Sequence, residues 1–202
     1  MSYFKRDLRK EEELGKHLDL IYQKKGIRFQ RVLDMDRQHQ GIDLIYHSKN
    51  NEYYIDEKAQ LDYLNADLPT FTFEISYYKN ANLKTGWLFD KNKITTHYFL
   101  VTAIYTNDEN DLLKGFRSCK ITSVNREKLL SELDLLGIDQ DILTEYDRVF
   151  RKAKRTGKIP IKELDPRTEG ALFLSPHLAE RPMNLQLRLS FLEKIKAGKK
   201  IH

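Results

Sequence analysis

Hydrophobic residues recur at helical spacing near the beginning of the chain. The stripe is formed by Leu8, Leu14, Leu18 and Ile21, and Gly26 then supplies a stop signal. This spacing predicts a helix from about Phe4 to Lys25. Glu11 precedes Leu14 by three residues and Leu18 by seven, so we expect it near the inward stripe, whereas Glu12 and Glu13 project further round the helix.

After Gly26 the spacing of hydrophobic residues changes to that of strands. The predicted strands lie at 27–33, 41–47, 52–60, 71–77, 97–105 and 116–124. Ser-Lys-Asn-Asn at 48–51 has the composition of a turn and would join the second strand to the third. A short apolar segment at 86–89 lies between the later strands.

Helical spacing returns at Asn125, and Gly137 marks the end of the first helix predicted there. A second helix is predicted at 140–155 and a short last one at 185–197, after a segment that contains four prolines. The order of helix, strands and helices predicts an α/β fold with a central mixed sheet flanked by helices. We expect an α/β core at 1–124 and a mainly helical C-terminal extension at 125–202, packed on that core.

Composition narrows the class of protein. The 202 residues are 40% hydrophobic and 32% charged, which is typical of a soluble globular chain. The sequence has no apolar run of the roughly 20 residues that a membrane helix needs, no secretory signal pattern and one cysteine, Cys119, so we expect a cytoplasmic protein with a buried structural thiol. The net charge of +5 favours polyanionic partners such as DNA.

The candidate chemistry lies in two neighbouring strands, Gly41-Ile42-Asp43 and Asp56-Glu57-Lys58. Because strand side chains alternate between faces, Asp56, Lys58 and Gln60 share one face. If the two strands pair, Asp43 comes beside Asp56. Neighbouring carboxylates repel unless a cation is present, and hard oxygen ligands suit Mg²⁺, with Mn²⁺ as a substitute. Lys58 would then orient the attacking water or neutralise charge on a phosphate.

Other interpretations stay open at this point. An Asp-x-Lys triplet is commonly a surface ion pair, and Gln60 is as consistent with an ordinary polar sheet residue as with a contact to DNA or to a metal-bound water. Glu57 is an alternative acidic member, although it lies on the opposite strand face from Lys58.

The order of these elements resembles the PD-(D/E)xK nuclease superfamily, which includes restriction endonucleases and archaeal Holliday-junction resolvases. The resemblance covers about residues 8–105, and the 13-residue separation of Asp43 and Asp56 is similar to that in the resolvases. It implies a restriction-endonuclease-like core and Mg²⁺-dependent DNA hydrolysis, with metal held by Asp43 and Asp56, Glu11 as a further ligand and Lys58 assisting the nucleophile. The sequence departs from the family in having Asp rather than Glu at position 56, and Glu12 and Glu13 compete with Glu11.

Basic residues in the predicted helix at 140–155 offer a nucleic-acid-binding face. The i, i+3, i+4, i+7 spacing belongs to Arg148, Arg151, Lys152 and Arg155. The resemblance to the PD-(D/E)xK superfamily implies a nuclease of restriction, repair, recombination or phage or mobile-element function, with homodimerisation common in such enzymes. The alternatives are a non-catalytic nucleic-acid-binding or scaffolding protein of the same fold, and an interaction module for an acidic protein.

Overall fold

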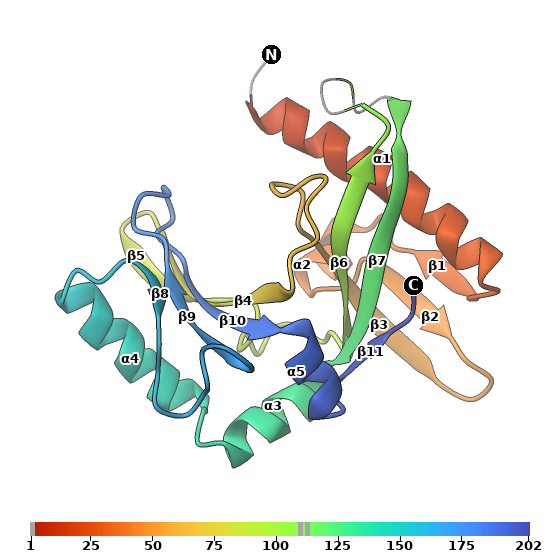
Figure 1. The fold of residues 1–202 in the computed structure, drawn as a ribbon. Helices are drawn as coiled ribbons and strands as arrows, with labels where there is room; N and C mark the ends of the chain where they lie inside the picture. Colours follow the sequence, from red (N-terminus) through yellow and green to blue (C-terminus); the bar gives the residue numbers. More distant parts are fainter. Residues whose placement is uncertain (1–2, 109–110, 112–113) are drawn as a thin grey trace. The chain divides into compact units, whose positions relative to one another are not determined.

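The computed structural model describes residues 3–108, 111 and 114–202 and divides the chain into two compact units (Figure 1). Unit 1 comprises Met1–Leu68, Ile94–Val124 and Lys200–His202, and unit 2 comprises Pro69–Lys93 and Asn125–Lys199. Each unit has a sheet of its own.

Unit 1 is built on a six-stranded mixed sheet of order β1-β2-β3-β6-β7-β11 (Figure 1). Strands β1, β2 and β3 are antiparallel neighbours, whereas β3 runs parallel to β6. The strand bounds are β1 Phe29–Arg31, β2 Leu44–His47, β3 Glu52–Ala59, β6 His97–Thr106, β7 Phe116–Asn125 and β11 Gly198–Lys200. Two helices belong to this unit, α1 at Tyr3–Lys24 and α2 at Met35–His39.

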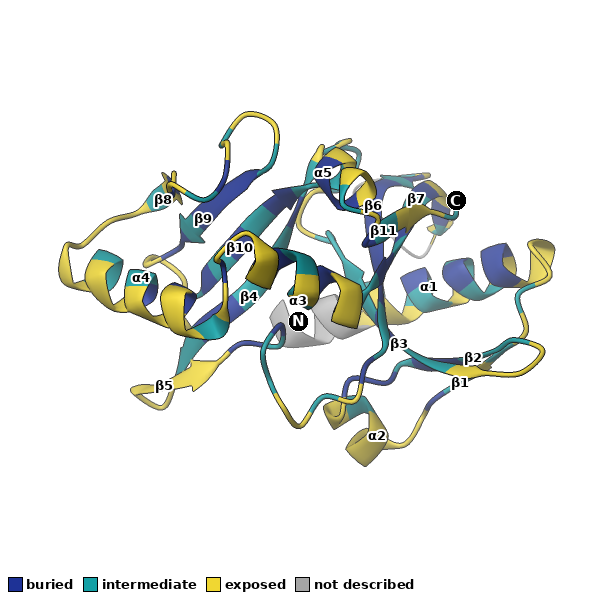
Figure 2. Ribbon diagram, turned by 90° about the horizontal axis from the view of Figure 1, so that it is seen from below, coloured by how far each residue is buried: buried dark blue, intermediate teal, exposed yellow. Residues whose placement is uncertain are grey.

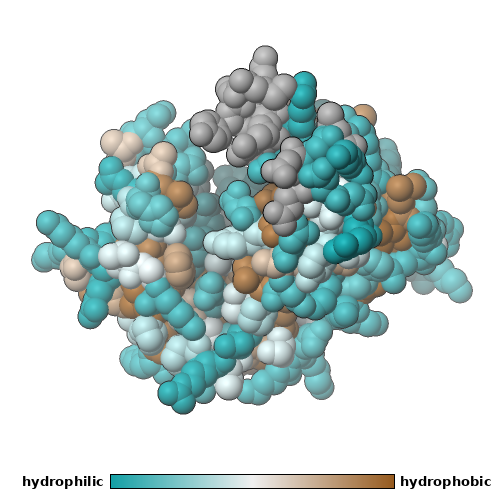
Figure 3. Space-filling model, turned by 45° about the horizontal axis from the view of Figure 1, so that its top comes forward, coloured by the Kyte–Doolittle hydropathy of each residue, from teal (hydrophilic) through white to brown (hydrophobic). Residues whose placement is uncertain are grey.

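Helix α1 covers one face of this sheet with a single apolar stripe. Its buried residues are Leu14, Leu18, Ile21 and Tyr22, and Figure 2 colours the buried parts of the helix dark blue. They pack against sheet residues that include Leu44, Ile55, Phe99, Val101 and Ile121. The face of the molecule drawn in Figure 3 is by contrast mostly hydrophilic, with only small separate apolar patches. Burial of apolar surface therefore holds α1 on the sheet.

Unit 2 is built on a five-stranded antiparallel sheet of order β5-β4-β10-β9-β8. Its strands are β4 Thr70–Lys79, β5 Asn82–Thr85, β8 Gly157–Ile159, β9 Gly170–Leu174 and β10 Met183–Arg188. Its helices are α3 Arg126–Leu135, α4 Gln140–Lys152 and α5 Leu189–Lys194. The Asn125 and Asp139 side chains cap α3 and α4 by accepting backbone hydrogen bonds at their N-termini.

The architecture confirms an α/β protein with a mixed sheet flanked by helices, and it corrects the C-terminal part. Residues 125–202 carry three helices but also β8, β9, β10 and β11, so they are not mainly helical. Because these strands are short and prolines interrupt the segment, the alternation of hydrophobic and polar residues that marks a strand is hard to recognise in the sequence. At 185–188 the chain forms a strand rather than the start of a helix, with Met183, Leu185 and Leu187 buried at every second position. The division into compact units has one boundary between Val124 and Asn125, and it places 69–93 in unit 2 and 200–202 in unit 1.

Candidate functional site

Asp43 is positioned by the turn that connects α2 to β2. Gly41 has a φ of +78°, a left-handed conformation that favours glycine because other residues meet a steric penalty there. The carbonyl of Gly41 accepts a hydrogen bond of 2.7 Å from the buried Thr95 hydroxyl. Ile42 is fully buried and anchors the turn, so Asp43 enters β2 in a fixed orientation.

The β2–β3 hairpin brings the two aspartates close together. The β2–β3 ladder ends at the Leu44–Ile55 pair, and Asp43 comes just before it, close enough to Asp56 for the two carboxyl groups to interact. The Asp43 N–H donates to the Ile55 carbonyl at 2.8 Å, and the Glu57 N–H donates to Asp43 Oδ2 at 2.7 Å. The Asp43 carboxylate is therefore tied to the backbone of β3.

Asp56 is a buried carboxyl group with one charged partner. Lys58 Nζ lies 2.7 Å from Asp56 Oδ1, and the Asp56 side chain is 4% exposed against 30% for Lys58. Within the described residues, Asp56 Oδ2 is buried and has no hydrogen-bond partner. This buried oxygen is thus available to a ligand or to a proton.

Burial raises the pKa of Asp56 from 3.8 to about 6. The positive charge of Lys58 lowers this pKa in part. The Asp43 carboxylate raises it by its negative charge, and because a protonated Asp56 can donate a hydrogen bond to it. The pair is thus poised to exchange a proton for a cation near neutral pH.

Glu57 faces the opposite side of β3 and belongs to a separate network. The Tyr22 hydroxyl donates to Glu57 Oε1 at 2.5 Å, and Arg31 forms ion pairs with both Glu57 and Asp19. Burial raises the pKa of Glu57, which Arg31 and Tyr22 partly offset. Since this network joins β3 to β1 and to α1 beneath the sheet, Glu57 serves to hold the helix on the strands.

The structure does not bring Glu11 to the aspartate pair. Glu11 is exposed, and its neighbours Glu12 and Glu13 both form ion pairs with Lys16. Helix α1 contacts the sheet face that carries Glu57, whereas Asp56 projects from the other face. Among the residues that the structure describes, no group of three or more His, Cys, Asp or Glu side chains could hold a metal ion.

Gln60 lies directly after β3 and is half-buried. Its N–H donates to the Val101 carbonyl of β6 at 3.0 Å, which continues the parallel pairing of the two strands. This hydrogen bond fixes the backbone of Gln60 at the end of β3, the strand that carries Asp56 and Lys58.

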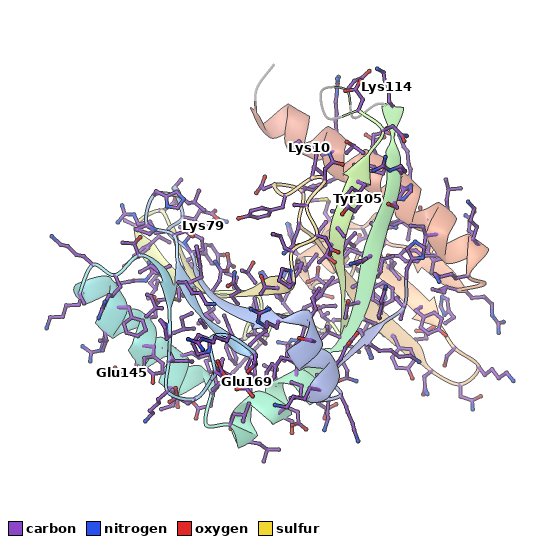
Figure 4. All side chains as sticks on the ribbon, viewed as in Figure 1. Lys10, Lys79, Tyr105, Lys114, Glu145 and Glu169 are labelled. Carbon is purple, nitrogen blue, oxygen red and sulfur yellow. The ribbon has the colours of Figure 1, made fainter. Side chains whose placement is uncertain are left out.

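The basic residues of α4 do not form the single face that their spacing predicts. Helix α4 ends at Lys152, and Lys154 adopts a φ of +52°, so Arg155 lies beyond the helix. Arg148 is exposed and paired with Glu145, which Figure 4 labels on α4. Arg151 instead turns inward, with 14% of its side chain exposed, to an ion pair with the buried Asp147.

Sequence reasoning missed two residues of this basic region, Asp147 and Arg181. Arg181 lies 30 residues after Arg151 and meets it only through the folding of unit 2, where its carbonyl accepts a hydrogen bond of 2.9 Å from Arg151 Nη1. No local pattern could have indicated that contact. Asp147 did have a signal, since it lies four residues after the buried Leu143 on the inward stripe of α4.

Cys119 is buried as expected, and burial raises the pKa of its thiol to about 12. None of the helices in the described residues is long and apolar enough to cross a membrane. Comparison of the chain with protein-family models, with curated proteins and with solved structures found no match. The chemistry of the site itself must therefore carry any functional assignment.

Proposed function

We propose that this protein is a metal-dependent nuclease that hydrolyses DNA phosphodiester bonds at Asp43, Asp56 and Lys58. The single observation that supports this most is the closeness of Asp43 to a buried Asp56 whose pKa is raised to about 6, next to a lysine two residues along the strand. Perturbed carboxyl groups of this kind concentrate at functional sites. The restriction-endonuclease-like core and its family membership belong to the same proposal.

The donor set fits Mg²⁺. Asp43 and Asp56 present hard oxygen donors from adjacent strands, and Mg²⁺ typically uses one or two protein carboxylates and keeps several waters. The buried Oδ2 of Asp56, which lacks a hydrogen-bond donor within the described residues, is an oxygen that a cation would stabilise. When bound, Mg²⁺ would stabilise charge on the phosphate and make water a better nucleophile.

Lys58 has two tasks in this proposal. In the structure it balances the charge of Asp56 at 2.7 Å. Towards a substrate, the ammonium group of Lys58 would orient the attacking water and neutralise charge that develops on the phosphate. Its partial exposure, 30% of the side chain, lets it reach a substrate while its stem stays on the sheet.

The test is cleavage of single-stranded, duplex and branched DNA with Mg²⁺ or Mn²⁺. Asp56→Asn, Asp43→Asn and Lys58→Met should each lower the rate by at least about a hundredfold, the usual range for loss of an electrostatic or acid–base group. Matched controls are Asp62→Asn, an exposed aspartate after β3, and Lys49→Met, an exposed lysine in the β2–β3 turn.

Retained cleavage in all three site variants would refute the assignment of the active site. If the wild-type protein binds DNA but cuts no substrate with either metal, the non-catalytic nucleic-acid-binding alternative replaces the nuclease. If the control variants lose activity equally, the effect is one of folding rather than of chemistry.

A further inference from the structure

Unit 2 contains a basic pocket at the end of α4, well separated in sequence from the aspartate pair. Its volume is about 390 Å³, and its cationic lining consists of Arg151, Lys154, Arg155 and Arg181. Tyr78, Leu174 and Pro176 complete the wall, and none of these lining residues is acidic. We propose that this pocket binds a phosphomonoester group.

A buried polar network fixes Arg151 at the base of the pocket. Arg151 Nε lies 2.5 Å from Asp147 Oδ1, and its Nη2 donates to the Ser76 hydroxyl at 3.1 Å. The Ser76 hydroxyl in turn donates to Asp147 Oδ2 at 2.6 Å, and Asp147 is 1% exposed. Because Asp147 neutralises Arg151, this pair supplies rigidity, and the net positive charge of the pocket comes from the other three cations.

Those three cations lack protein counter-ions. Among the described residues, no acidic side chain forms an ion pair with Lys154, Arg155 or Arg181, whereas Arg151 in the same pocket is paired with Asp147. Like charges gathered in one pocket repel, and a multiply charged anion relieves that repulsion. A phosphomonoester carries nearly two negative charges near pH 7 and three acceptor oxygens, so it matches this set better than a carboxylate does.

Tyr78 limits what else the pocket can recognise. The guanidinium groups of Arg151 and Arg181 lie over its ring, at 5.0 and 5.6 Å from the centroid. Two cations thus already use the negative face of this ring. The ring serves to hold the guanidinium groups rather than to stack on a base, so we assign recognition to the phosphate and not to the base.

The size of the pocket indicates a phosphate with a carrier. A volume of about 390 Å³ falls in the roughly 300–1,000 Å³ range of small-ligand sites and exceeds what a bare ion fills. Leu174 and Pro176 offer a short apolar wall for the carrier. Two sources share this chemistry, a free nucleotide and the phosphorylated end of a nucleic-acid strand.

The test is calorimetric titration of the whole protein in EDTA, so binding is independent of the proposed nuclease activity. The probes are inorganic phosphate, adenosine monophosphate, adenosine, and one short single-stranded DNA with either a 5′-phosphate or a 5′-hydroxyl. Lys154→Gln and Arg155→Gln should each weaken binding of the phosphorylated probes about tenfold, as expected for loss of one charge-assisted contact. Lys152→Gln is the matched control, because it removes the same charge from an exposed residue two positions away that does not line the pocket.

Binding of adenosine monophosphate but not adenosine, weakened by the pocket variants and not by Lys152→Gln, supports the proposal. Tighter binding of the 5′-phosphorylated DNA than of the nucleotide assigns the site to strand ends, and the reverse order assigns it to free nucleotides. Equal binding of 5′-phosphate and 5′-hydroxyl DNA, equally weakened by Lys152→Gln, would overturn it in favour of diffuse backbone attraction. Failure of every phosphorylated probe to bind would also overturn it.

Discussion

Asp56→Asn should change how the free energy of unfolding depends on pH, because this substitution removes a carboxyl group whose ionisation is disfavoured by burial in the folded protein. In the folded protein burial raises the pKa of Asp56 from 3.8 to about 6. An acid whose pKa is higher in the folded than in the unfolded protein makes its full contribution to the free energy of unfolding below the unfolded pKa, here near 3.8. That contribution is lost as pH rises through the folded pKa of about 6. At about 1.4 kcal/mol per pH unit the loss amounts to about 3 kcal/mol.

The neutral variant lacks that pH-dependent loss. The free energy of unfolding of Asp56→Asn minus that of wild type should therefore be about 3 kcal/mol larger at pH 8 than at pH 3.5, which means that the variant gains relative stability at high pH. The comparison between pH values matters rather than either absolute value, because the ion pair with Lys58 exists only where Asp56 is ionised and already contributes to its pKa. Asp62→Asn, at an exposed position, should show no such difference.

Urea denaturation in EDTA, followed by circular dichroism, measures the effect. The only tryptophan in the sequence, Trp87, lies in unit 2, so circular dichroism rather than tryptophan fluorescence is the signal that includes unit 1. A stability difference that is the same at pH 3.5 and pH 8 would show that Asp56 is ionised throughout, and would refute the burial argument.

Three further predictions concern unit 1. Because a proton and Mg²⁺ compete for Asp56, apparent Mg²⁺ affinity measured by calorimetry should fall about tenfold per pH unit below about pH 6 and be level above pH 7, and a level affinity throughout would contradict the role of Asp56. Gly41→Ala should cost about 1–2 kcal/mol of unfolding free energy, because alanine is strained at a φ of +78°, and an unchanged denaturation midpoint would contradict this. Arg31→Leu should cost about 3 kcal/mol by leaving Glu57 without its counter-ion, whereas Arg28→Leu, at an exposed neighbour, should change the midpoint little.

The β2–β3 hairpin was predictable because its signals are local. Alternating hydrophobic residues predict both strands, the turn at 48–51 joins them, and the hairpin then brings Asp43 close to Asp56. The alternation also separates Glu57 from Lys58, and the network of Glu57 with Tyr22 and Arg31 is consistent with that separation. Everything in this part of the site follows from period and register.

The role of Glu11 could not be predicted by the same means. The helical phase of Glu11 with Leu14 and Leu18 suggests an inward position. Burial along α1 depends, however, on where the helix meets the sheet. Among the helix residues whose burial is described, the first buried one is Leu14. Which sheet face the helix covers is set by long-range packing of Tyr22 against Phe99 and Glu57. Helical phase alone carries no information about either fact.

The basic pocket escaped prediction for a related reason. A run of basic residues at 148–155 suggests one continuous helix, yet the left-handed backbone at Lys154 ends it early. Tyr78, Arg151 and Arg181 come from three separate segments, and the pairing of the Tyr78 N–H with the Glu180 carbonyl at 2.7 Å is what brings two of those segments together. Spacing within one segment cannot reveal a site that three segments share.

The distribution of charge is consistent with catalysis in unit 1 and phosphate binding in unit 2, the two functions that we propose. Unit 1 has 16 basic and 16 acidic residues, whereas unit 2 has 19 basic and 14 acidic residues and so carries the whole net charge of +5. An aspartate pair repels a polyanion until a cation is bound, so attraction for a phosphorylated substrate has to come from elsewhere. If the basic pocket supplies it, Lys154→Gln should raise KM and reduce its salt dependence while leaving kcat unchanged, and Asp56→Asn should abolish kcat while leaving metal-free binding intact. A variant of the pocket that lowered kcat alone would contradict this division, because a site that only binds phosphate has no means of changing the chemical step.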